Sequence, residues 1–103
     1  MDQITASTGF AAMGSDARLA VLRLLVRAGN AGLTVSDLQT RSGIAPSTLA
    51  HHLRVLTEAG VTEQVKDGRK TITRANYETL RQLATYVLEE CCADLPDKDH
   101  DHD

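Results

Sequence analysis

The sequence has few aromatic residues and no long apolar run. Its 103 residues include two tyrosines, one phenylalanine and no tryptophan, whereas apolar residues make up 42%. A core built mainly from Leu, Val and Ala favours packed helices over an all-β sandwich. No segment approaches the roughly 20 apolar residues of a membrane span, and the first ten residues lack a signal peptide's basic and apolar regions. We therefore expect a cytoplasmic protein with no membrane-spanning segment.

Cysteine is also scarce, and both cysteines, Cys91 and Cys92, are adjacent. Cytoplasmic thiols stay reduced, and neighbouring Cα atoms lie about 3.8 Å apart, whereas disulfides favour roughly 5.5 Å. A disulfide within the pair is therefore disfavoured, although bridging to a second chain stays open. The chain also lacks a Gly-rich phosphate loop, and its Cys and His nucleophile and base candidates do not assemble into a catalytic site. We expect no enzymatic activity.

The net charge of -3 is unevenly distributed along the chain. Residues 15–75 hold nine Lys/Arg against five Asp/Glu, whereas residues 76–103 hold two against eight. The basic charge of residues 15–75 favours binding to nucleic acid, whereas the acidic residues 76–103 indicate a separate role for the end of the chain. We expect one domain over residues 1–93 and a disordered acidic tail over 94–103. His100 and His102 in this tail are alternatively ligands for a cation such as zinc or nickel.

Apolar spacing and capping residues predict five helices and one hairpin. The helices are expected at residues 5–13, 16–28, 35–41, 46–58 and from 77 onward, with strands near 61–65 and 71–73. The third and fourth helices, joined by a turn containing Gly43, form a helix-turn-helix, and Asp67-Gly68 marks the hairpin turn. The predicted fold is mainly α, a winged helix of the α+β kind.

The fourth helix carries two faces with different chemistry. Leu49, Leu53 and Leu56 form an apolar face, and the opposite face holds Ser47, Ala50, His51 and Arg54. Hydroxyls, imidazole and guanidinium suit base edges and phosphates in a major groove, and the hairpin tip adds Lys66, Arg69 and Lys70. A merely solvated face, or a protein-binding module of the same topology, is the alternative.

Three stretches carry a family resemblance: Asp16-Ala17-Arg18-Leu19, then Ala45-Pro46-Ser47-Thr48-Leu49-Ala50-His51-His52-Leu53, continuing to Ala59-Gly60-Val61, and Asp67-Gly68-Arg69. They resemble the ArsR/SmtB family of dimeric winged-helix repressors, over most of the chain. Ala50 departs from the family's usual Ser. The resemblance implies double-stranded DNA with an inverted-repeat operator as partner, and a homodimer formed through the first and fifth helices. It also implies DNA contacts from Ser47, Thr48, His51, His52, Arg54, Arg69 and Lys70, although His52 is equally well explained as a packing residue.

Members of this family usually release DNA on binding a metal, a metalloid or an oxidant, but the usual sites are missing. A Cys-x-Cys at the third helix is replaced by Thr34 and Ser36, which helix capping explains. A zinc site on the fifth helix needs histidine, and residues 76–90 contain none. The second helix lacks the cysteine of the redox or persulfide type.

Cys91 and Cys92 remain as the candidate sensor. Two thiolates suit trivalent arsenic or antimony, As(III) or Sb(III), as inducer, with the third position taken by a partner subunit, a water or an organic substituent. Arsenic-responsive relatives with a C-terminal Cys-Cys pair typically have a further cysteine, which this chain lacks. A redox-responsive or ligand-independent DNA binder, with the cysteines as simple packing residues, stays open.

Overall fold

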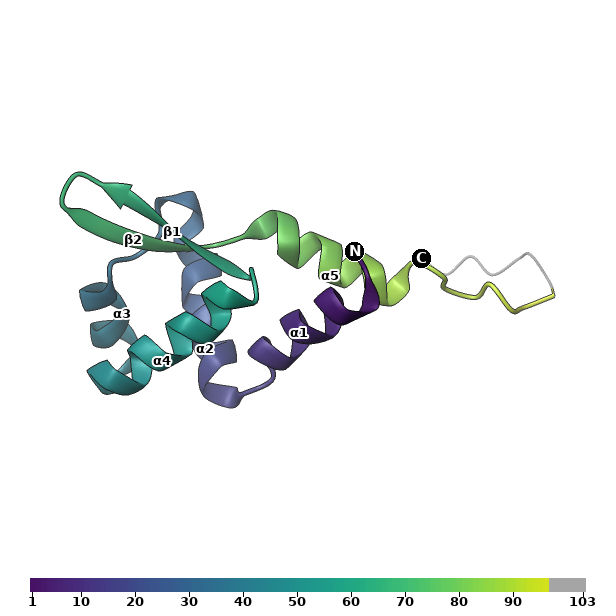
Figure 1. The fold of residues 1–103 in the computed structure, drawn as a ribbon, viewed down its shortest axis with the longest axis horizontal. Coiled ribbons are helices and arrows are strands. Elements are labelled where there is room, and N and C mark those ends of the chain that lie inside the picture. Colours follow the sequence, from purple (N-terminus) through teal and green to yellow (C-terminus); the bar gives the residue numbers. More distant parts are fainter. Residues whose placement is uncertain (97–103) are drawn as a thin grey trace.

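The computed structural model describes residues 1–96 as a group of helices with a small hairpin along one edge (Figure 1). The elements follow the order α1 (Gln3–Met13), α2 (Asp16–Ala28), the 3-10 turn η1 (Gly29–Ala31), α3 (Val35–Ser42), α4 (Pro46–Glu58), β1 (Thr62–Asp67), β2 (Lys70–Ala75) and α5 (Tyr77–Leu88). The predicted winged helix of five helices and a two-stranded hairpin is confirmed. The expected tail, with His100 and His102, lies outside the described residues apart from 94–96.

Side-chain caps explain where the helices begin. Asp2 accepts a hydrogen bond from the Thr5 amide, which starts α1 two residues earlier than expected. Thr34 and Asp37 form a reciprocal capping box at α3, so the capping role of Thr34 is confirmed. Gly43, in the left-handed region at φ 72°, ends α3 and opens the turn into α4.

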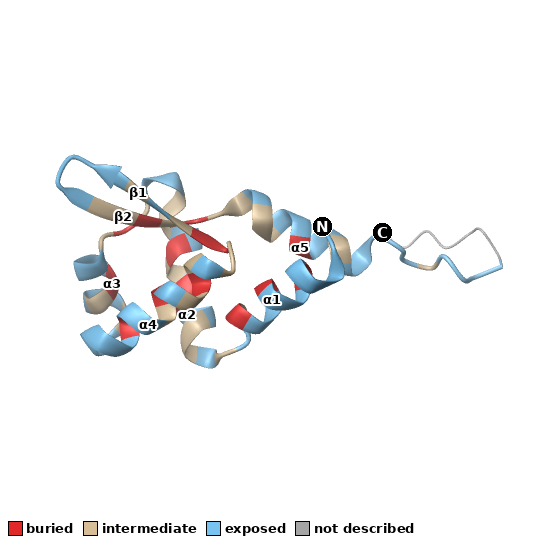
Figure 2. Cartoon of the chain, in the orientation of Figure 1, coloured by how far each residue is buried: buried red, intermediate tan, exposed pale blue. Residues whose placement is uncertain are grey.

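The core lies between α2, α3, α4 and the inner side of the hairpin (Figure 2). Leu49, Leu53 and Leu56 of α4 are buried there, as predicted. On α2 the apolar side chains of Leu19 and Val26 are exposed, because the helix turns Val21, Leu22 and Leu25 toward the core.

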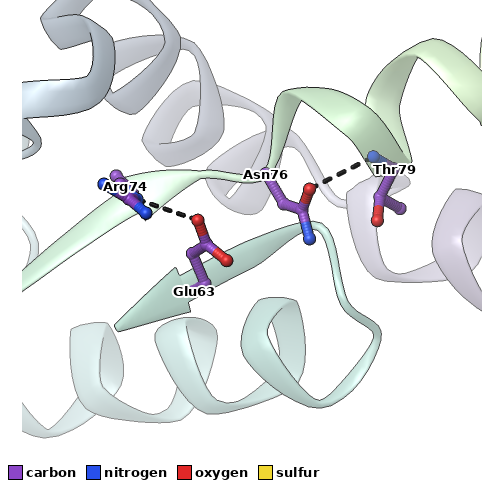
Figure 3. A network of polar contacts seen from close by, with 4 residues as sticks. All are labelled: Glu63, Arg74, Asn76 and Thr79. Carbon is purple, nitrogen blue, oxygen red and sulfur yellow. Dashed lines mark hydrogen bonds and ion pairs between the residues drawn. The ribbon is translucent and has the colours of Figure 1, made fainter. Parts of the chain in front are cut away.

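The hairpin is antiparallel, with Val65 opposite Ile72 and Asp67 opposite Lys70. Its two loop residues are therefore Gly68 and Arg69, one position later than the predicted Asp67-Gly68 turn. Gly68 has φ 66°, at the loop position that a type II′ turn reserves for glycine. Figure 3 shows the Arg74–Glu63 ion pair of 2.8 Å between the strands, and Asn76 capping α5 through the Thr79 amide.

A short segment at Leu33 pairs with the hairpin and holds it against the rest of the domain. Leu33 and Thr73 exchange two backbone hydrogen bonds of 2.9 Å, which apolar spacing did not predict. Gly32 makes this approach feasible, since a Cβ there would lie 2.6 Å from the Thr73 carbonyl oxygen and also clash with Ile72.

Helices α1 and α5 pack together at the end of the molecule opposite the wing tip (Figure 1). Gly9 of α1 allows the close approach, because a Cβ at this position would lie 3.0 Å from a Leu83 methyl group. Leu83 is the only fully buried residue of α5, whereas Val87 and Leu88 are 63% and 66% exposed. Helix α5 therefore carries apolar surface that the core of one chain does not cover.

Gly32→Ala is expected to destabilise the domain more than Gly29→Ala, by about 1–3 kcal/mol. Both glycines have positive φ with extended ψ, a region costly to any other residue, but only Gly32 has neighbours against its missing Cβ. Urea unfolding of both variants measures the difference. Equal losses would show that the Leu33–Thr73 contact does not depend on the absent side chain.

Candidate nucleic-acid interface and thiol site

Helix α4 begins at Pro46, which occupies the first helical position after Ala45. Because its leucine face is buried, the opposite face is held toward solvent. Ser47, Thr48, His51 and Arg54 are all exposed on this face, as an interface requires. Their predicted role as DNA contacts stays a prediction.

His52 differs from these residues because its ring turns toward the protein. The side chain is half-buried, and its Nδ1 atom is buried with no hydrogen-bond partner among the described residues. Burial lowers the pKa of His52, and the neighbouring Arg18 and His51 lower that pKa further. A neutral, half-buried imidazole favours the packing interpretation over a direct DNA contact.

The wing supplies the exposed cations Lys66, Arg69 and Lys70. Figure 1 places the wing tip and the N-terminal end of α4 at the same end of the molecule, away from α1 and α5. One duplex can therefore meet both elements, with the helix in a groove and the wing along the backbone.

A cleft between α4 and the wing adds a residue that sequence reasoning missed. Gln64 of β1 is exposed and lines a cleft of about 280 Å³ together with Ala50 and Arg54 of α4. Its outward position on the first strand was the available signal, but the sequence did not indicate that this strand faces α4.

Cys91 and Cys92 lie in a turn that follows α5 rather than on the helix itself. The turn is held by hydrogen bonds from the Cys91 amide to the Leu88 carbonyl and from the Leu95 amide to the Cys92 carbonyl. Cys92 has φ 68°, the left-handed region that non-glycine residues rarely adopt. This backbone brings the two Sγ atoms to 3.2 Å from each other.

The sulfur separation sets the angle that the two sulfurs would make at a shared atom. If each sulfur lies about 2.3 Å from a shared atom, as in zinc thiolates, a separation of 3.2 Å corresponds to an angle of roughly 90° at that atom. Tetrahedral zinc would require sulfurs roughly 3.8 Å apart. Trivalent arsenic and antimony are pyramidal and have narrower angles, because a lone pair occupies the fourth position.

Over residues 1–96, no group of three or more His, Cys, Asp or Glu residues is arranged to hold a metal ion. The residues of the tail proposed as ligands, His100 and His102, lie outside that range.

The two thiols also affect each other's chemistry. The Cys91 sulfur, first as a hydrogen-bond partner and also as a neighbouring charge, raises the pKa of the Cys92 thiol, and partial burial adds to this effect. A shared cation would remove this repulsion, because both sulfurs could then bind it as thiolates.

Cys91→Ala is expected to lower the pKa of Cys92 toward its usual value, since the substitution removes the main cause of the rise. A lower pKa gives more thiolate near neutral pH, so iodoacetamide should modify Cys92 faster in this variant than in the original chain. Alkylation rates followed by mass spectrometry across pH provide the measurement, with Val87→Ala as the control. An unchanged pH profile for Cys92 would contradict the coupling.

Comparison with known proteins agrees with this geometry. A family model described as a helix-turn-helix domain matches residues 13–65. The HTH-type transcriptional regulator YceK of Bacillus subtilis (strain 168) is 33% identical over 88 residues, covering 85% of this chain and 86% of that protein.

Solved structures extend the likeness to the whole winged helix. An ArsR-like transcriptional regulator from Rhodococcus sp. RHA1 is 32% identical, with a TM-score of 0.76, covering 87% of this chain and 81% of that one. A protein described as a "Possible transcriptional regulator for arsenical resistance" is 29% identical, with a TM-score of 0.64, covering 86% and 97%.

The described part of the chain contains no helix long and apolar enough to cross a membrane. The relatives are transcriptional regulators, and the fold of this chain is similar to that of the solved ArsR-like regulator. The chain belongs to the ArsR family of winged helix-turn-helix transcriptional regulators, with a DNA-binding helix-turn-helix.

Proposed function

We propose that this regulator is a homodimeric repressor that leaves its operator when a trivalent arsenical or antimonial binds Cys91 and Cys92. The observation that carries the inducer assignment is the 3.2 Å separation of two sulfurs on a left-handed turn. A backbone of this kind is maintained at a cost of order 1–3 kcal/mol and is typical of functional sites. The similarity to a regulator described for arsenical resistance supports the same ligand class.

Exposed apolar surface on α1 and α5 supports the homodimer. Ile4 and Phe10 of α1 are 77% and 39% exposed, and Val87 and Leu88 of α5 are exposed as well. Surface of this kind is commonly buried against a second copy. A two-fold axis through these helices would direct both copies of α4 toward DNA, so the operator would be an inverted repeat with half-sites about one helical turn, or a multiple of it, apart.

Each copy would contribute the same contacts. Ser47, Thr48, His51 and Arg54 would face base edges and phosphates in the major groove, and Arg69 and Lys70 would neutralise phosphates along the wing. Binding would then have a sequence-specific part from α4 and a salt-dependent part from the wing.

Dimerisation would also place the thiol pair near the interface between the two copies. Because Cys91 and Cys92 follow α5 directly, a ligand there lies at one end of the helix that joins the two copies. Inducer binding could thereby change the relative orientation of the two α4 helices, which must match the operator spacing.

Arg69→Ala and Lys70→Ala are each expected to weaken binding to every duplex and to reduce the slope of log affinity against log salt by about 1. Ser47→Ala and His51→Ala should instead weaken binding to the preferred duplex by roughly 5-fold to 100-fold and reduce sequence discrimination. Fluorescence anisotropy at several salt concentrations, with duplexes selected from a random pool, measures both effects.

Arg81→Ala is the matched control, because this exposed arginine lies on α5, away from the wing and α4. It should leave affinity and salt slope unchanged. If it weakens binding as much as Arg69→Ala does, net charge rather than the wing accounts for the loss.

Replacing both Cys91 and Cys92 by Ser should preserve DNA binding and abolish release by trivalent arsenicals. In the original chain we expect the arsenical to lower affinity for DNA by roughly 5-fold to 150-fold, the usual range of allosteric coupling. Gel-shift titrations in a thiol-free reductant measure this. Release that persists in the double-serine variant would refute the thiol site.

A further inference from the structure

One exposed position in the first half of α4 carries no polar group. Over residues 47–54 the exposed side chains are those of Ser47, Thr48, Ala50, His51 and Arg54, and Ala50 alone among them cannot form a hydrogen bond. Its neighbours on the helix surface, three residues before it and four residues after it, are Ser47 and Arg54. Ala50 therefore lies beside the side chains that we propose face DNA.

The methyl group of Ala50 belongs to a larger apolar surface. Ala50 lines the cleft between α4 and the wing, and the other aliphatic side chains that line this cleft are Val35 and Leu53. Val35, the first residue of α3, is 38% exposed, so a second helix also presents apolar surface there. The cleft volume of about 280 Å³ exceeds the roughly 150 Å³ of a cavity that holds benzene. The edge of a base that carries a methyl group can therefore enter it.

An apolar side chain in a major groove distinguishes bases in one way. The C5 methyl group of thymine is the apolar group that base pairs present there, and alanine is one of the side chains that contact it. Cytosine at the same place lacks this methyl group and presents an N4 donor, to which Ala50 offers no acceptor. Both differences favour thymine over cytosine.

We infer that Ala50 contacts the C5 methyl group of a thymine and thereby specifies that base in each half-site of the operator. The inference rests on the proposed function, because it requires α4 to lie in the major groove, and it names one base of the site. Ala50 directly precedes His51, and one residue of helix advances less than one base pair does. The thymine therefore lies within about one base pair of the position that His51 reads.

The first experiment removes a single methyl group from the DNA. Duplexes selected from a random pool by the full-length protein are remade with deoxyuridine, which lacks the C5 methyl group, in place of each thymine in turn. Fluorescence anisotropy at a fixed salt concentration should show a loss of affinity of roughly 2-fold to 5-fold at one thymine of the half-site. Ala50→Gly, which removes the methyl group from the protein, should abolish the loss at that thymine.

Ala20→Gly is the matched control for this variant. Ala20 is an exposed alanine of α2, so its replacement has the same cost in helix propensity without changing α4. The loss on deoxyuridine substitution should persist in this control. An equal loss at every thymine in the original chain and in Ala50→Gly would overturn the inference, as would a selected half-site that contains no thymine.

A second experiment avoids placing glycine in the helix. Cytosine and then 5-methylcytosine, both paired with guanine, are placed at the sensitive position, so the two duplexes differ by one methyl group. The original chain should bind the 5-methylcytosine duplex roughly 2-fold to 5-fold more tightly. Ala50→Ser should reduce this difference, because its hydroxyl can accept a hydrogen bond from cytosine N4. Equal affinity of the original chain for the two duplexes would overturn the inference.

The inference and the proposed function fail separately. If Ser47→Ala and His51→Ala reduce sequence discrimination but no thymine responds to Ala50, only the thymine contact is refuted. If Ser47→Ala and His51→Ala leave discrimination unchanged, base reading by α4 is refuted, and the thymine contact with it.

Discussion

The buried leucine face of α4 is the constraint on which the rest of the interface depends. Leu49, Leu53 and Leu56 are at most 4% exposed, and this burial fixes the rotation of the helix about its own axis. With 3.6 residues per turn, the positions on the opposite side of the helix face solvent. Ser47, His51 and Arg54 form an outward row because the core holds the other side.

The same logic explains which features the sequence predicted well. The capping residues Ser15, Thr34 and Asn76 form local hydrogen bonds with residues three positions away, so their patterns are readable without the fold. The leucine spacing of α4 is local in the same sense. The alternating residues after Gly60 and the Asp67-Gly68 signal likewise predicted the hairpin, and the cations at its tip indicated a wing, with which the family resemblance agrees.

The features that were missed depend on contacts distant in sequence. Leu19 is apolar at helical spacing and yet exposed, because which side of α2 meets the core is decided by α3, α4 and β2. The Leu33–Thr73 pairing and the Tyr86–Gln3 hydrogen bond join segments 40 and 83 residues apart. The convergence of the two sulfurs depends on a single left-handed residue, and cysteine gives no sign of that conformation in the sequence.

Helix α1 is the element that touches both functional regions. Its first turn lines a cleft beside Cys91, and it packs on α4 as well as on α5. Near its end, the Ala12 carbonyl accepts a 2.6 Å hydrogen bond from Arg18, the residue whose charge acts on His52 in α4. A displacement of α1 would therefore also move α4, the helix that we propose contacts DNA. Small side chains at Ala6, Gly9 and Ala12 permit this central position.

The left-handed backbone at Cys92 has a consequence for timing. Because the turn already holds the sulfurs together, an incoming soft atom does not have to wait for the chain to search for a closed arrangement. Most of the loss of chain entropy occurs when the protein folds, before any ligand arrives. The rate at which the ligand is captured would then be governed by ligand exchange at sulfur. The ligand concentration that triggers release from DNA would be governed by sulfur chemistry rather than by the flexibility of the protein.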